Sequence, residues 1–184
     1  NGTTTGLVAS TAATQTYTGG TGSWSDVTKW TSRVPLPQDD VLMSGVTGGT
    51  ITADMPRAGK NINWTGAANS PALSYSTTNT IYGSLTLISA MNFSVGSSDT
   101  TFEGRSSFTW TTAGKQFLPA AGRVTIAMFG GTLTLQDSLI GASSTSFLQF
   151  QYGTFNAISF NVAAGHINAS AGGTKIINMG SGTW

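Results

Sequence analysis

Short segments of alternating apolar and polar residues recur along most of the chain, and they constrain its fold more than any other feature. Each is rich in Thr, Val, Ile and aromatic residues, and Gly, Ser or Asn separates it from the next, about 8–12 residues on. This pattern predicts an all-β domain of the sandwich, barrel or solenoid type. The expected strands are Thr50–Asp54, Ile62–Trp64, Leu73–Tyr75, Leu85–Ile88, Phe93–Val95, Phe108–Trp110, Val124–Met128, Leu133–Leu135, Phe147–Phe150, Ile158–Val162 and Ile176–Met179.

An internal repeat favours the solenoid among these folds. Gly83–Leu87 (GSLTL) is echoed by Gly131–Leu135 (GTLTL), and Ala113-Gly114 is echoed by Ala164-Gly165. A period of about 50 residues that contains several short strands fits two turns of a parallel β-solenoid. The closing Gly182-Thr183-Trp184 matches the start of GTLTL. We therefore expect a third copy that is cut off or completed by another subunit. A β-sandwich or jelly roll is the alternative fold.

The segment 23–41 (SWSDVTKWTSRVPLPQDDV) differs from the rest of the chain. It contains two of the five tryptophans and two of the five prolines. The first turn of a solenoid leaves an apolar face and open strand edges that must be covered. Trp24 and Trp30 offer large apolar surfaces for this, and Pro35 and Pro37 remove backbone donors from an edge. The segment is therefore predicted to be a cap.

The predicted organisation has three parts. Residues 1–22 form an N-terminal arm or linker, 23–45 form the Trp/Pro-rich cap, and 46–184 form the β-solenoid. The solenoid holds repeats at 83–130 and 131–182 and is expected to be truncated at the C-terminus. The residues expected to face its interior are Leu85, Leu87, Phe93, Phe102, Phe108, Val124, Ile126, Leu133, Leu135, Phe147, Phe155, Ile158, Phe160, Ile167 and Ile176.

The cap carries a resemblance to known proteins. Trp24-Ser25-Asp26, Trp30, Val34-Pro35 and Asp39-Asp40-Val41 resemble the entry motif W-S-D/N…N-W…V-P…D-D-V of repetitive secreted and phage-borne β-solenoid proteins. The chain departs from that motif at Lys29, where the family has Asn. The segment 54–60, the GSLTL stretch and the closing residues 178–184 also resemble parts of phage tail or virion structural proteins. The resemblance implies a structural role on a virion, or in a related secreted bacterial adhesin.

Composition excludes several classes of function. Charged residues make up 8% of the chain, against about 25% in typical domains. A net charge of +1 without a basic stripe predicts no nucleic-acid partner. The chain has no cysteine and no apolar run of about 18 residues, so neither thiolate chemistry nor a membrane span is expected. A surface of hydroxyls and amides favours a location on a virion or outside the cell.

The acidic residues are the first candidates for chemistry. Asp39 and Asp40 could bind Ca²⁺, but neighbouring side chains of a strand point to opposite faces, which favours a hydrogen-bonded turn. Asp26 is interpreted as a turn cap. Asp99 and Glu103, with Asp137 on a neighbouring turn, could form the carboxylate pair of a glycosidase, and solvated turn acids are the alternative.

The remaining candidates are rings. His166 is the only histidine, and it occupies a position that the repeat gives to Lys115, which favours a solvated turn. Tyr75, Tyr82, Trp110 and Tyr152 could form a platform for a sugar, although the alternation of Trp110 with Phe108 favours a core position and Tyr152 suits the edge of a turn.

The sequence therefore predicts no catalytic, cofactor-binding or metal-binding residue and no enzyme. The predicted function is a structural component of a phage virion surface or of a tail or head fibre. One alternative is a secreted adhesin or filament subunit that binds carbohydrate, and another is a tailspike that cleaves polysaccharide. Other virion or filament subunits, in a homo-oligomer, and a cell-surface glycan are the expected partners.

Overall fold

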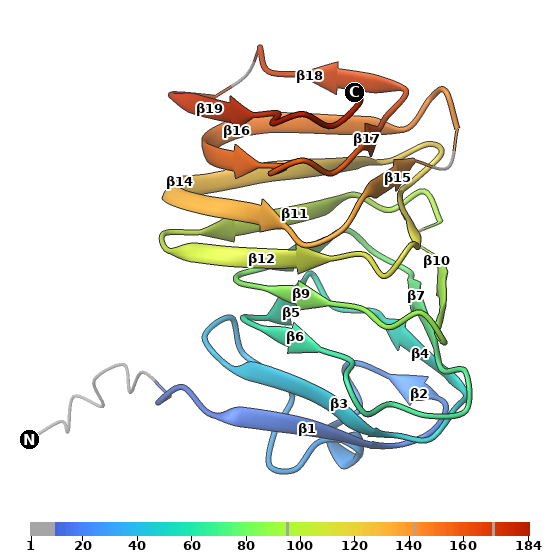
Figure 1. Ribbon diagram of the computed structural model, residues 1–184. Helices are drawn as coiled ribbons and strands as arrows, with labels where there is room; N and C mark the ends of the chain where they lie inside the picture. The colour runs from blue at the N-terminus through green and yellow to red at the C-terminus, as the bar shows by residue number, and fades with distance from the viewer. Residues whose placement is uncertain (1–9, 95, 142, 171) are drawn as a thin grey trace, which may run out of the picture.

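The computed structural model describes residues 10–184 except 95, 142 and 171, and it is a parallel β-solenoid of about seven turns (Figure 1). Every pairing between its named strands is parallel. Greek-key sandwiches and jelly rolls are built from antiparallel strands, so this pattern excludes the alternative fold. The predicted fold class is confirmed. In the described residues, the only helix is the short 3₁₀ segment η1 (Val27–Lys29).

The strands lie on three faces of the solenoid. The first face contains β1 (Thr14–Gly19), β3 (Asp40–Val46), β6 (Ile62–Asn63), β9 (Leu85–Thr86), β12 (Ser107–Thr111), the second halves of β14 (Arg123–Leu135) and β16 (Phe147–Asn156), and β19 (Lys175–Asn178). The second contains β2 (Gly22–Ser23), β4 (Thr50–Ala53), β7 (Ala72–Tyr75), β10 (Asn92–Ser94), β13 (Gln116–Leu118), β15 (Leu139–Gly141) and β17 (Val162–Ala163). The third contains β5 (Arg57–Gly59), β8 (Asn79–Ile81), β11 (Thr100–Gly104), the first halves of β14 and β16, and β18 (His166–Asn168).

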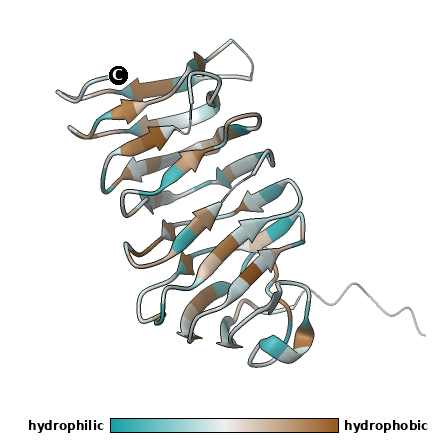
Figure 2. Cartoon of the chain, turned by 90° about the vertical axis from the view of Figure 1, so that its right-hand side faces the viewer, coloured by the Kyte–Doolittle hydropathy of each residue, from teal (hydrophilic) through white to brown (hydrophobic). Residues whose placement is uncertain are grey.

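Equivalent residues of successive turns stack on one another. On the first face, Leu85 pairs with Trp110, 25 residues later, and Trp110 pairs with Leu135, a further 25 residues later. Fifty residues therefore span two turns in this part of the chain. The sequence comparison aligned Leu85 with Leu133, which is wrong by two residues, because Leu133 pairs with Phe108. Figure 2 shows the result, with apolar segments recurring on successive strands of the stack.

Large aromatic side chains from all three faces meet in the interior. Phe102 of β11, Trp110 of β12 and Phe117 of β13 are fully buried. The ring centroids of Phe102 and Trp110 lie 4.6 Å apart, and those of Trp110 and Phe117 lie 4.9 Å apart. No turn could bury these rings alone, so neighbouring turns share one core.

The interior differs from the prediction at several positions. Leu85, Leu87, Phe102, Val124, Ile126, Leu133, Leu135 and Phe155 are buried as expected, whereas Phe93, Phe108, Phe147 and Phe160 are half-buried. Ile158, Ile167 and Ile176 are exposed, which corrects the prediction. Ile158 lies in a turn with a φ of +58°, in place of the strand expected at 158–162. Ile177 pairs with the buried Phe155, so its neighbour Ile176 faces outward.

The predicted cap residues cover the first turn. Trp24 and Trp30 keep only 2% and 5% of their surface exposed. Trp30 packs edge-on against Tyr17 with centroids 5.0 Å apart, and its Nε1 donates a hydrogen bond to the Trp24 carbonyl at 2.7 Å. The loop with η1 lies beneath β1 in Figure 1.

The start of the solenoid differs from the predicted boundaries. β1 already pairs with β3, and β2 pairs with β4, so residues 14–23 form the first turn and the stack begins before residue 46. Residues 1–9 of the expected arm lie outside the described residues, as does Val95 of the strand expected at 93–95.

The last residues do not occupy the position that the repeat predicted. The Val162 amide donates to the Thr183 carbonyl at 2.9 Å, so Thr183 continues the second face above β17. Leu133, to which the sequence comparison matched Trp184, lies on the first face. The resemblance of GTW to GTL is therefore not a structural equivalence.

Replacing Trp110 with Ala tests the shared core. The Trp110 indole N–H has no hydrogen-bond partner, so the substitution removes only packing. We expect W110A to lower the free energy of unfolding in urea by about 3–5 kcal/mol. Thr109 is the matched control, because it is exposed in the same strand. T109A should change stability by less than about 0.5 kcal/mol, and equal losses in the two variants would contradict the shared core.

Candidate functional site

The adjacent acids at the end of the cap are bound into the fold. The Asp39 side chain is fully buried, and it accepts hydrogen bonds from the amides of Ala13 (2.8 Å) and Leu36 (2.9 Å) and from the Arg33 guanidinium (2.7 Å). Burial raises the pKa of the Asp39 carboxyl, but the Leu36 amide, Arg33 and the Ala13 amide together hold that pKa below its ordinary value. The hydrogen-bonded turn expected before β3 is present, since the Asp39 amide donates to the Leu36 carbonyl.

The other acids of this region serve similar purposes. Asp40 accepts a hydrogen bond from the Asn61 side chain at 2.7 Å, on the next turn. Asp26 is the N-cap of η1, as its predicted role as a turn cap requires, and the Thr28 side chain and amide lower its pKa by donating to it. Within residues 10–184, apart from the three undescribed positions, no group of three or more His, Asp or Glu residues is placed to hold a metal ion.

The candidate glycosidase acids do not converge. Asp99 accepts from the Arg123 amide at 2.8 Å and forms an ion pair with its guanidinium at 3.4 Å. Asp137 accepts from the Thr112 amide and hydroxyl at 2.8 and 2.9 Å and from the Ala113 amide at 2.5 Å. Glu103 lies at the other end of β11 from Asp99, and four extended residues separate their Cα atoms by about 13 Å. A glycosidase pair places two carboxyls about 5–9.5 Å apart across one bond, whereas Asp99 is bound to Arg123 and Asp137 to the Thr112–Ala113 turn.

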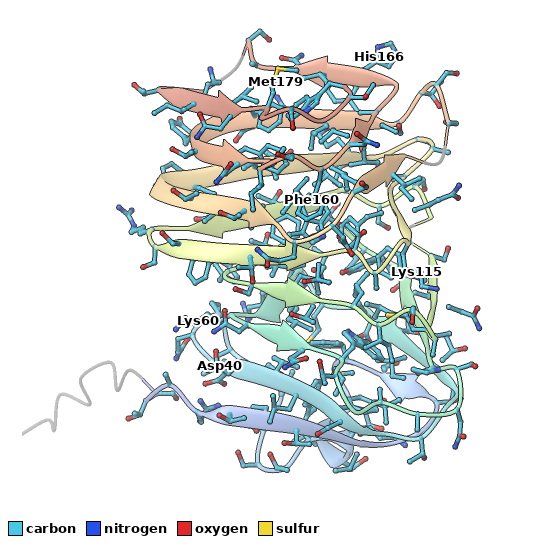
Figure 3. All side chains as sticks on the ribbon, viewed as in Figure 1. Asp40, Lys60, Lys115, Phe160, His166 and Met179 are labelled. Carbon is cyan, nitrogen blue, oxygen red and sulfur yellow. The ribbon has the colours of Figure 1, made fainter. Side chains whose placement is uncertain are left out.

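His166 and Lys115 are not equivalent positions. His166 begins β18 on the third face, where it pairs with Phe147, whereas Lys115 precedes β13 on the second face. The repeat position assigned to both is therefore wrong, and their burial also differs, because His166 is exposed and Lys115 is half-buried. Figure 3 shows His166 and Met179 at one end of the stack, and Lys115 on an earlier turn.

Two of the four rings considered for a sugar platform belong to the core. Trp110 is fully buried, as its alternation predicted, and Tyr75 keeps 6% of its surface exposed. Burial also raises the pKa of the Tyr75 phenol. Tyr82 and Tyr152 remain partly exposed.

Tyr82 and Tyr152 border a continuous hollow surface, which we call the corner groove: Tyr82, Glu103, Arg105, Phe129, Tyr152 and Ile176. It follows the corner at the left of Figure 1, where β11 leads into β12 and where β14 and β16 bend. A hollow of about 290 Å³ lies between Tyr82, Glu103 and Phe129. A second, of about 490 Å³, lies between Phe129, Tyr152 and Ile176. Arg105 and Phe129 line both hollows.

Three side chains of the corner groove, Arg105, Phe129 and Tyr152, pack against one another. The Phe129 and Tyr152 rings stack with centroids 4.5 Å apart and planes inclined by 28°. The Arg105 guanidinium lies over the Phe129 ring, 5.7 Å from its centroid. Phe129 is 37% exposed and Ile176 is 53% exposed, so apolar surface faces solvent along the groove.

Glycines keep the groove open. Gly153 has a φ of +79°, and an added Cβ would collide with the Met128 carbonyl, so this bend of β16 requires glycine. A Cβ on Gly173 would lie 2.9 Å from the Tyr152 ring. Glycine at these two positions therefore permits the bend of β16 and leaves room for the Tyr152 ring.

Phe129 and Arg105 are the groove residues that the sequence analysis missed, and the sequence offered a signal for Phe129. Residues 127–129 (Ala-Met-Phe) are three successive apolar residues, which cannot all face the interior of a strand. Met128 is buried and Phe129 is exposed. The break in alternation immediately before Gly130-Gly131 was the available signal.

The comparisons with known proteins do not supply a family. No family model, no curated protein and no solved structure matches this chain. Among the described residues, no helix has both the length and the apolar character needed to cross a membrane.

The hydrogen bonds of Asp39 predict a dependence of stability on pH. Because its pKa is lowered in the folded state, the ionised carboxyl stabilises the fold above about pH 4, and this contribution is lost as the pH falls through the folded-state value. D39N should lower the free energy of unfolding by about 3 kcal/mol at pH 7. This is the low end for a broken buried ion pair, because the Arg33 side chain retains 34% exposure. The difference in free energy of unfolding between D39N and the unchanged chain should become smaller below about pH 4. Urea unfolding across pH 2–7 measures it.

D40N is the matched control for this experiment. Asp40 is half-buried and has one side-chain partner, Asn61, so its substitution should cost only about 1 kcal/mol. A loss in D39N that stays constant from pH 7 to pH 2 would show that the ionised carboxyl is not the stabilising group.

Proposed function

We propose that the chain is a non-enzymatic structural component of a virion surface or of a tail or head fibre, in which it acts as a rigid scaffold for assembly and attachment. The observation that carries the proposal is the parallel stack from β1 to β19 around one core, held together by a 12-stranded sheet that runs through it. Such a stack is stiff along its axis because each turn is hydrogen-bonded to the turns next to it. The resemblance of the cap to phage-borne solenoid proteins supports the same role.

The roles of the acids support a function without turnover. Asp39 and Asp137 each accept several hydrogen bonds, and Asp99 is paired with Arg123. A polysaccharide-cleaving tailspike would need two carboxylates on opposite sides of one bond. Glu103 is the only acid that lines the corner groove, so this groove lacks the second carboxylate that the tailspike alternative needs.

The last described turn exposes apolar side chains beside open strand edges, which a further strand of this chain or of another subunit would cover. Four of the six exposed large hydrophobic residues, Ile158, Ile167, Ile176 and Met179, lie after residue 157. β18 and β19 each pair only with β16, so each has a free edge among the described residues. Apolar surface beside open strands is typical of interfaces between protein subunits.

A secreted adhesin or filament subunit that binds carbohydrate is the second candidate. The corner groove favours it, because its exposed rings are available to a ligand, unlike those of the core. A rigid scaffold and a binding surface are compatible in one molecule, so the two candidates differ in where the protein is found.

Immunogold labelling separates these possibilities. Antibodies raised against the purified chain should label virions from the source organism, on their surface or along their fibres. Labelling of cell-borne filaments without virions would favour the adhesin. Recovery of the protein only from the cytosol would contradict both. Release of reducing ends from a polysaccharide panel by the purified chain would contradict the non-enzymatic role.

The exposed end predicts self-association of the purified chain. Sedimentation velocity should show a concentration-dependent shift from monomer to oligomer, and the double variant I167D/M179K should abolish it by placing charge on the apolar end. The matched control is V27D, because Val27 is 57% exposed at the opposite end of the stack. Loss of association in V27D but not in I167D/M179K would place the interface elsewhere.

A further inference from the structure

We propose that the corner groove binds a neutral polysaccharide of pyranose residues, whose chain lies along the axis of the solenoid. The inference concerns the ligand of one surface and stands whether the scaffold belongs to a virion or to a filament. It follows from three properties of the groove: its exposed rings, its balanced charge and its spacing.

The exposed rings match the chemistry of a sugar. A pyranose presents a face of C–H groups, which carry partial positive charge, and the face of an aromatic ring is negative. Phe129 and Tyr152 form one stacked pair beside the larger hollow, and Tyr82 borders the smaller one. The lining beside these rings includes Gly130, Gly131 and Gly153, whose backbone leaves room for a ligand against the stacked pair.

The charges of the groove match a neutral ligand that carries many hydroxyls. Glu103 and Arg105 are its only charged side chains, so its net charge is zero. Neither makes a hydrogen bond or an ion pair to another side chain in the part of the chain that the structure describes. Glu103 can accept from sugar hydroxyls and Arg105 can donate to them. A polyanion such as nucleic acid would meet a single arginine beside a glutamate, which is too little positive charge to hold phosphates.

The spacing of the groove matches a repeating chain. Its residues come from five successive turns, in the order Tyr82, Arg105, Phe129, Tyr152 and Ile176. Turns of a parallel stack are about 4.8 Å apart, so the groove extends about 19 Å. The distance of about 4.8 Å between neighbouring turns is close to the length of one pyranose residue in an extended polysaccharide. Successive sugars can therefore lie against successive turns, although the side chains that they would meet differ from turn to turn.

The test uses the purified chain in affinity electrophoresis through gels that contain β-glucan, mannan, galactan or the acidic polysaccharide alginate, followed by calorimetric titration with the oligosaccharide of the best neutral hit. We expect retardation by at least one neutral polysaccharide. The double variant F129A/Y152A should weaken binding by about tenfold or more, because it removes the ring platform. I158A is the matched control, because Ile158 is 46% exposed and lies outside the groove. The affinity of I158A for the oligosaccharide should stay within about twofold of that of the unchanged chain.

Several results would overturn the proposal. Retardation by none of the neutral polysaccharides, or by alginate alone, would show that the ligand class is wrong. Unchanged affinity in F129A/Y152A would show that the sugar binds elsewhere. If circular dichroism shows that this variant is unfolded, E103Q/R105A replaces it, and about a fivefold loss is expected from removing two polar contacts. If the chain binds no glycan but antibodies still label virions, the scaffold role remains and only the polysaccharide site is refuted. If the chain binds glycan but antibodies do not label virions, only the virion role is refuted.

Discussion

The structure depends on backbone hydrogen bonding between successive turns. A single turn of this chain has no partner for its strand N–H and C=O groups and no second layer to cover its apolar side chains. Stacking meets both needs at once, because the register that pairs Leu85 with Trp110 and Trp110 with Leu135 also brings their side chains together inside. The two ends of the stack are then its weak points. At one end Trp24 and Trp30 cover the core, and at the other Ile167 and Met179 are exposed.

The alternation in the sequence predicted the strands but could not fix their alignment. Leu133 and Leu135 are both buried, as the pattern indicated, yet only Leu135 belongs to the column of Leu85. A shift of two residues leaves every side chain of a strand on the same face, so both alignments bury the same residues. The length of each turn decides between them. It varies, with 21 residues from Val41 to Ile62 and 25 from Leu85 to Trp110, and no local pattern records that variation.

The corner groove was only partly predictable, for a related reason. The sequence named four candidate rings, of which Tyr82 and Tyr152 border the groove, whereas Tyr75 and Trp110 lie in the core. Phe129 precedes a glycine, but the sequence gives no sign that it lies against Tyr152. That contact joins residues 23 apart and depends on the register of β14 with β16, including the irregularity after Ile126.

Parallel stacking also explains why so few residues are charged. Each outward side chain lies about 4.8 Å from its equivalents on the neighbouring turns, so like charges in one column would repel one another along its length. Hydroxyls and amides avoid this cost, as in the outward column Thr109, Thr134, Asn156 and Asn178. One pair of charges on neighbouring turns, Asp99 and Arg123, is opposite in sign and forms an ion pair. A hydroxyl-rich surface is thus a consequence of the fold itself. The corner groove, with one acid, one base and exposed rings, differs from that surface, and we therefore assign the proposed polysaccharide site to it.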